Sequence, residues 1–243
     1  RLLALLAMLL LSTASPLSAQ LLLQEGFEVE SCAPVNLNGE PGLTELVDAN
    51  NCLNGWSRWH GSPNISTNNN PPEGLQALKL RWWLPEDPPP VIFSEGVFAN
   101  LPSTLISGDE VLLSFYVFVS SGSDILIDFM LTNGVQAVPL PNGGNSCLQL
   151  PVNPNNFQII TSIQAGNLGS GWQTITVPCT TVNGTYNQLA IRLESINNPG
   201  NNGNQGNIFF DDIQLQKEPT FTEPTATITN ITGDLCSGDA LSV

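Results

Sequence analysis

The sequence has 243 residues, of which 41% are hydrophobic and 11% are charged, and its 21 acidic residues against 6 basic ones give a net charge of -15. This negative charge argues against binding to nucleic acid or to an anionic membrane surface. The hydrophobic fraction also separates the chain from disordered proteins. We expect one large β domain, or one such domain with part of a second.

The first part of the chain, residues 1–19, has the pattern of a secretory signal peptide. Arg1 precedes an apolar run over residues 2–11, and small residues follow up to Ala19. The run is shorter than the about 20 residues that span a bilayer, so we predict cleavage after Ala19 rather than membrane insertion. Because the sequence starts at Arg1 without a methionine, we expect this signal peptide to be truncated at its start. A secreted or cell-surface location is the resulting prediction.

Five cysteines in an exported chain are most simply explained by disulfides. Nearest-neighbour pairing joins Cys32 to Cys52 and Cys147 to Cys179 and leaves Cys236 alone, although the sequence alone does not prove this connectivity. Each bridge would stabilise the fold by roughly 3 kcal/mol through the entropy of the unfolded chain. A zinc site is disfavoured, since no Cys-x-x-Cys occurs and the chain has one histidine.

Beyond the signal peptide, short segments alternate apolar and polar residues, which is typical of strands with one buried face. Nine such segments are predicted to be strands: residues 21–25, 78–84, 91–98, 111–119, 125–131, 157–163, 172–177, 188–193 and 208–215. The connections are rich in Asn, Gly and Pro, as turns are, and no convincing amphipathic helix is found. We therefore predict an all-β fold, an antiparallel β-sandwich of about nine strands in residues 20–217.

The last predicted strand, residues 208–215, is an apolar run that Asp211 and Asp212 interrupt in the middle. A carboxylate in apolar surroundings needs a partner, and a bound cation is one of the few that a strand can recruit. Residues 23–28 have the same mixed character. We expect the first and last strands to lie side by side, so that these two acidic stretches meet.

The composition changes after Lys217. Residues 218–225 contain two prolines among Thr and Glu residues, a composition that predicts an extended linker. Residues 226–243 look like the opening of an immunoglobulin-like or PKD-like repeat, truncated at its end. We therefore expect this chain to be part of a longer, multidomain protein.

Four short motifs, residues 25–28, 112–116, 171–172 and 210–213, occur in an order that resembles a known superfamily. They are similar to motifs of jelly-roll carbohydrate-binding modules and galactose-binding-like domains, which open with Gly-x-Phe-Glu and close with Asp-Asp-Ile. Residues 55–63 also resemble part of such modules in large bacterial surface proteins, many of them exported by type IX secretion. The resemblance implies a jelly-roll fold for residues 20–217 and a glycan or cell-surface polysaccharide as partner.

The same resemblance implies a structural calcium between the first and last strands. Its ligands would be Glu28 and one of Asp211 or Asp212, completed by main-chain carbonyls, in line with the six to eight oxygen ligands that calcium takes. The alternative is that Asp211 and Asp212 only cap or solvate a strand end.

Strand alternation also indicates which side chains face away from the core. If the apolar residues face inward, five polar or aromatic residues face outward, where rings can stack on sugars and charged groups can bind hydroxyls. These candidate carbohydrate-binding residues are Arg81, Trp83, Tyr116, Asp128 and Arg192. The alternative is that they form the edge of the core.

A second candidate carbohydrate site is the segment of residues 56–60, read as a loop, with Trp56 and Trp59 as its rings. The alternative is that both tryptophans fill one end of the sandwich. A Ser-His-Asp triad would have to use His60, yet no Gly-x-Ser-x-Gly is present, which argues against a hydrolase.

The sequence therefore predicts a non-catalytic extracellular module for carbohydrate binding or adhesion. One alternative is a purely structural spacer domain. Another is an accessory domain of a glycoside hydrolase or protease whose catalytic part lies elsewhere.

Overall fold

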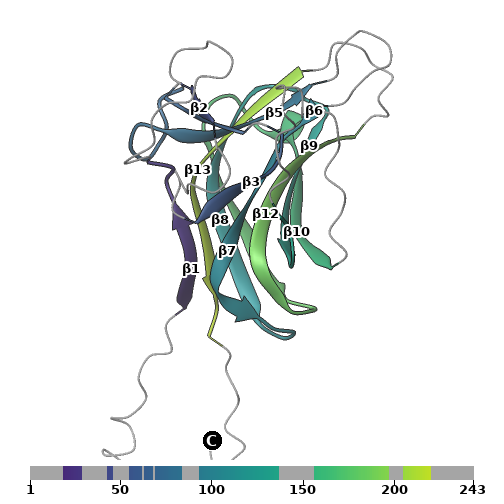
Figure 1. Ribbon diagram of the computed structural model, residues 1–243. Coiled ribbons are helices and arrows are strands. Elements are labelled where there is room, and N and C mark those ends of the chain that lie inside the picture. The colour runs from purple at the N-terminus through teal and green to yellow at the C-terminus, as the bar shows by residue number, and fades with distance from the viewer. Residues whose placement is uncertain are drawn as a thin grey trace, which may run out of the picture.

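A computed structural model describes residues 19–28, 43–45, 55–61, 63–67, 69–83, 93–136, 156–196 and 205–219. They form two antiparallel sheets packed face to face, as Figure 1 shows. The prediction of an all-β sandwich is confirmed. Residues 1–18 of the predicted signal peptide, residues 220–225 of the predicted linker, the segment from residue 226, and Cys32, Cys52, Cys147 and Cys236 lie outside the described residues.

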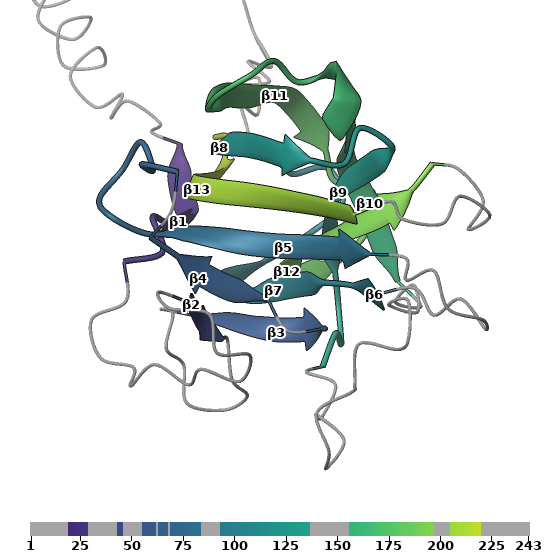
Figure 2. The same cartoon turned by 90° about the horizontal axis from the view of Figure 1, so that it is seen from above.

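The larger sheet has eight strands. Six of them run in the order β11 (Gln173–Thr181), β8 (Glu110–Ser121), β13 (Gln205–Lys217), β5 (Ala77–Trp83), β4 (Asn64–Ser66) and β2 (Leu43–Glu45). In addition, β1 (Gln20–Glu25) pairs with β13, and β6 (Phe93–Ser94) pairs with β5. Figure 2 shows β11, β8, β13 and β5 side by side.

The smaller sheet has five strands. Their order is β10 (Phe157–Gln164), β9 (Ile125–Thr132), β12 (Tyr186–Ser195), β7 (Gly96–Leu105) and β3 (Trp56–His60). A single 3-10 turn, Ala165–Asn167, is the only helical element in the described part of the chain. None of the described helical residues forms a segment long and apolar enough to cross a membrane.

All nine predicted segments contain strands; eight have ends within four residues of the prediction, whereas the ninth, 91–98, continues to Leu105. The segment 91–98 is divided, because Glu95 separates β6 from the start of β7. The expectation of a loop at residues 56–60 is wrong, since these residues form β3 at the edge of the smaller sheet. Its Arg58 and His60 are buried polar residues, which hid the strand pattern from the sequence.

The core lies between the sheets and is built from the alternating residues of each strand. The inward residues of β5, β8, β9 and β12 are buried as predicted, among them Leu80, Leu113, Ile127 and Leu193. Phe115 of β8 stacks on Phe129 of β9 with ring centroids 4.3 Å apart, which joins the two sheets at the centre. This alternation leaves every second side chain of these strands on an outer face.

The first and last strands lie side by side, as predicted. Gln20 pairs with Lys217 and Glu25 with Ile213, so β1 begins where β13 ends. Beyond β1 the chain turns at Phe27, whose φ of 59° is unusual for a bulky residue. The fully buried Phe27 ring packs on Trp56 at 5.7 Å and closes this side of the sandwich.

Candidate functional site

The two adjacent carboxylates of β13 form a β-bulge. Asp211 pairs with Tyr116 and Gln214 with Ser114, so the register shifts between them, and Asp212 has a φ of 42°. A bulge inserts a residue into one strand and redirects its side chains. It therefore explains how two consecutive acids fit between the inward residues Phe210 and Ile213.

Asp211 lies at the centre of an acidic cluster with Glu25 and Glu28. Burial raises the pKa of Asp211 to about 6; hydrogen bonds from the Glu73 and Asp212 amides oppose the shift, and the charges of Asp212 and Glu28 add to it. Burial also raises the pKa of Glu25, against the hydrogen bond from the Phe27 amide and with the charges of Asp211 and Glu28.

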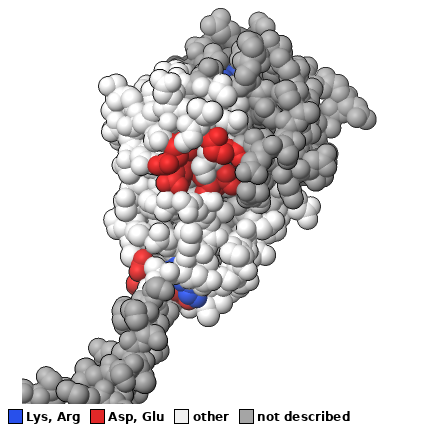
Figure 3. All heavy atoms as spheres, turned by 90° about the vertical axis from the view of Figure 1, so that its left-hand side faces the viewer, with Lys and Arg blue, Asp and Glu red and all other residues white. Residues whose placement is uncertain are grey.

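Figure 3 shows an acidic cluster on this side of the molecule, and no Lys or Arg adjoins it on the part of that face that is described. Acidic side chains that repel one another and are partly buried are stabilised by a cation or by protonation. This cluster has that character.

The cluster also holds the connection between β4 and β5. Glu28 Oε1 accepts the Leu75 amide at 2.6 Å and the Gln76 amide at 2.9 Å. Asp211 Oδ2 accepts the Glu73 amide at 2.8 Å. Three main-chain donors of one loop are thus satisfied by two carboxylates from the two ends of the domain.

Of the predicted metal ligands, Glu28 and Asp211 come together. The Asp212 carboxylate instead accepts hydrogen bonds from the side-chain amides of Gln24, at 3.4 Å, and Gln214, at 2.8 Å. Within the described ranges, no three His, Cys, Asp or Glu side chains are arranged to hold a metal by themselves. A cation here would need main-chain oxygens as further ligands. The donor set would then consist of oxygen alone, which is the chemistry that calcium takes.

A row of aromatic rings lies on the outer face of the larger sheet, near this cluster. Phe118 of β8 lies 5.7 Å from the Trp172 ring, which precedes β11, and 5.8 Å from the Phe209 ring of β13. Trp172 and Phe118 are partly exposed, and Phe209 is 4% exposed. We call Trp172, Phe118 and Phe209 the aromatic row.

Polar candidates predicted from the sequence flank the aromatic row. Tyr116, half-buried on β8, lies two residues from Phe118 on the same outer face. Arg81 of β5 donates from Nε to Asn207 Oδ1 at 3.4 Å, and Asn207 lies two residues before Phe209. Trp83 lies on β5 opposite Gln205, and only its main chain is described. The structure therefore brings Arg81 and Tyr116 to one face.

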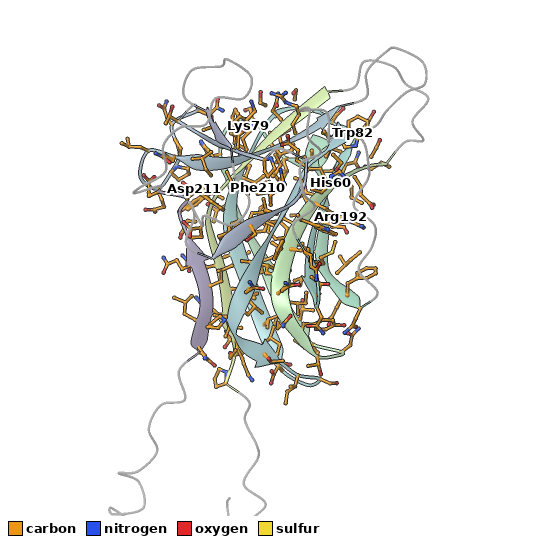
Figure 4. The ribbon with its side chains drawn as sticks, viewed as in Figure 1. His60, Lys79, Trp82, Arg192, Phe210 and Asp211 are labelled. Carbon is orange, nitrogen blue, oxygen red and sulfur yellow. The ribbon has the colours of Figure 1, made fainter. Side chains whose placement is uncertain are left out.

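The other two strand candidates lie on the outer face of the smaller sheet. Arg192 of β12 is paired directly with Asp128 of β9, and its Nη2 lies 2.9 Å from Asp128 Oδ2 and 2.9 Å from Glu194 Oε1. Asp128 also accepts the Ser162 hydroxyl. Both side chains face away from the core as predicted, yet they are buried and bonded to each other. Figure 4 shows Arg192 and Asp211 well apart, so the predicted residues form no single site.

The tryptophans of β3 are both buried. Trp56 is 2% exposed and belongs to the main core, while Trp59 packs with Phe98 and Met130 on the outer side of the smaller sheet. Neither ring presents a face to solvent. Trp56 lies between the two sheets, as the alternative expected, whereas Trp59 packs outside the space between them. Of the predicted disulfide residues only Cys179 is described; it is exposed on β11, and both pairings remain predictions.

Three site residues that were not singled out as candidates lie in or just after the sequence motifs. Trp172 and Glu25 stand in motifs of the resemblance, and Phe118 follows another. Alternation places Phe118 on the face of Tyr116, which was a usable signal. The contacts of the β4–β5 connection had no signal in the sequence.

No protein-family model and no curated protein matches the chain. Several solved structures share a remote likeness. The Stig cyclase Fisc from Fischerella sp. TAU is 14% identical, and the match covers 84% of this chain and 100% of that chain with a TM-score of 0.44. The CBM22-1 xylan-binding domain from Paenibacillus barcinonensis Xyn10C is 13% identical over 85% and 100%, with a TM-score of 0.42. TmCBM61, solved with β-1,4-galactotriose, is 13% identical over 67% and 87%, with a TM-score of 0.33. The β-sandwich is shown by the two sheets of this chain itself.

Proposed function

We propose that this chain is a non-catalytic extracellular module that binds a glycan through the outer face of its larger sheet. The observation that carries the proposal is the aromatic row beside Tyr116 and the Arg81–Asn207 pair. Partly exposed rings offer apolar faces to sugar rings, and adjacent charged and amide groups bind hydroxyls. The face suits a cell-surface polysaccharide, and binding there would serve adhesion.

Calcium at the acidic cluster is the second part of the proposal. Glu28 and Asp211 would supply side-chain oxygens, with Asp212 or Glu25 as a further neighbour and main-chain carbonyls as the remaining ligands. Calcium would neutralise carboxylates that repel one another, and so hold β1 against β13. Its role would be structural.

The net charge and the predicted signal peptide fit a secreted or cell-surface location. The distant solved structures include xylan- and galactotriose-binding modules, but sequence identities of 13% leave the ligand of this chain to experiment.

The test is a glycan array probed with the whole chain, its cysteines oxidised and calcium present. The expected result is a small set of related glycans bound by the wild type, with the signal lost in Tyr116→Ala. A matched control is Ile159→Ala, which removes an exposed apolar side chain, 41% exposed, from the smaller sheet. Silence across plant, algal, host and bacterial glycans would instead favour the structural spacer.

A further inference from the structure

The connection between β4 and β5 joins the acidic cluster to the aromatic row. We propose that residues 69–76, the bridging loop, position Trp172 for binding on the outer face of the larger sheet, and that Glu28 and Asp211 hold this loop in place. The inference rests on the proposed glycan face. It adds a positioning element whose anchors lie away from the rings themselves.

One end of the bridging loop is fastened to the acidic cluster. The Glu73, Leu75 and Gln76 amides donate to Asp211 and Glu28 at 2.6–2.9 Å. Hydrogen bonds from main-chain amides to carboxylates are among the stronger ones in proteins, because the acceptor is charged. This end of the loop is therefore fixed by three such bonds.

The other end is fastened to the aromatic row. Trp172 Nε1 donates to the main-chain oxygen of Asn69 at 2.8 Å. Asn69 and Asn70 have φ values of 74° and 48°, a conformation that Asn tolerates better than most residues. The same Trp172 ring packs on Phe118. An indole with one hydrogen-bonded edge and one packed face has a defined orientation.

Gly74 shows how closely the loop fits its anchor. Its φ is 60°, and a Cβ atom built on it would overlap the Glu28 carboxylate. A side chain at position 74 meets the Glu28 carboxylate in a backbone conformation that L residues rarely adopt, and alanine there should shift Glu28 away from the Leu75 and Gln76 amides. Figure 2 shows the same arrangement at the level of the chain, with the connection between β4 and β5 reaching toward β1 and β13.

The chain of contacts runs from Glu28 through the loop to Trp172. Loosening either end removes a restraint on the other, and this coupling is reciprocal. A change at position 74 should therefore weaken binding on the aromatic row without touching a ring. A change at Trp172 should in turn loosen the amides at the far end of the loop.

Gly74→Ala tests the first direction, and Gly134→Ala is its matched control, because Gly134 has a φ of 70° with open space around it. In Gly74→Ala we expect amide exchange at Leu75 and Gln76 to accelerate about tenfold, a shifted Trp172 indole resonance, and glycan affinity reduced about tenfold. Gly134→Ala should retain the wild-type values of all three.

Trp172→Phe tests the reverse direction and serves where Gly74→Ala does not fold. It keeps a six-membered ring next to Phe118 but removes the pyrrole part of the indole with its N–H donor to Asn69, so amide exchange at Glu73 should accelerate. Loosened loop amides in Gly74→Ala with an unmoved Trp172 indole would overturn the inference. So would unchanged exchange at Glu73 in Trp172→Phe.

The indole and exchange measurements need no ligand. Failure of the wild type to bind any glycan therefore counts against the proposed function alone, while the coupling is still decided by the two spectroscopic readouts.

Discussion

Arg192 and Asp128 face each other directly across β12 and β9, with Nη2 and Oδ2 2.9 Å apart, and both side chains are almost fully buried. The interaction extends to Ser162 on the neighbouring strand β10. Ser162 pairs with Asp128 across the sheet, and its hydroxyl donates a hydrogen bond to the Asp128 carboxylate. Charged groups removed from water need this degree of pairing. The pair is an internal support of the smaller sheet.

Breaking this pair should destabilise the domain strongly. We expect Arg192→Ala to lower the free energy of unfolding by about 3–5 kcal/mol, because the Asp128 carboxylate is then left buried without its main partner. Urea unfolding followed by fluorescence measures the change. Arg81→Ala, at a more exposed site, should cost about 1 kcal/mol or less. Equal effects of the two substitutions would contradict the structural role.

Asp211 should make stability fall as pH rises in calcium-free solution. The folded chain keeps this proton up to about pH 6, whereas the unfolded chain releases it near the ordinary value of 3.8. Between these values the folded state binds more protons, so the free energy of unfolding decreases with rising pH, by roughly 2–3 kcal/mol in all. Glu25, whose pKa is also raised, contributes in the same direction.

Unfolding measured in chelator across this range checks the sign. Asp211→Asn should flatten the dependence. Asp109→Asn provides a contrast in sign. Burial acts to raise the Asp109 pKa, but the hydrogen bonds from Lys217 and from the Ile106 amide outweigh it, so the pKa is lowered. Asp109 therefore contributes stability that is present above its unfolded pKa and lost in acid, opposite to Asp211. A stability that rises with pH in the wild type and persists in Asp211→Asn would refute the assignment.

Calcium removal should lower the melting temperature. If the ion binds the folded state at the acidic cluster, calcium at 100 times its Kd adds about 2.7 kcal/mol, enough to raise the melting temperature by several degrees. Differential scanning calorimetry in millimolar calcium and in chelator measures this. Asp211→Asn should abolish the increase, and Asp109→Asn should retain it. A wild-type melting temperature that ignores calcium would remove the metal from the proposal.

Local pattern was enough to predict the long strands and their faces, although the short strands β2, β3 and β4 were missed. The alternation in residues 78–84 and 111–119 placed Leu80 and Leu113 in the core and Tyr116 outside it, because the period of a strand fixes its faces. The pairing of β1 with β13 was predicted because each strand carries an acidic stretch, and one bound cation could serve both stretches if the strands lay side by side.

Sheet membership was not predictable in the same way. β5 and β8 share a face only because β13, the last strand, lies between them, and Asp128 and Arg192 belong to the other sheet. These are non-local pairings that no single segment encodes. Trp56 and Trp59 differ in surroundings because they stand three residues apart on β3, so that their side chains point to opposite faces of the smaller sheet.

The most direct test of the glycan-binding face is the dissociation constant of the best array glycan, measured by calorimetry for the wild type, Tyr116→Ala, Trp172→Ala and Ile159→Ala. If the glycan binds on the face that carries the aromatic row and Tyr116, Tyr116→Ala and Trp172→Ala should each bind at least about tenfold more weakly, as for other central aromatic contacts. Ile159→Ala should keep the dissociation constant of the wild type. Wild-type affinity in both Tyr116→Ala and Trp172→Ala would show that the glycan binds elsewhere on the molecule.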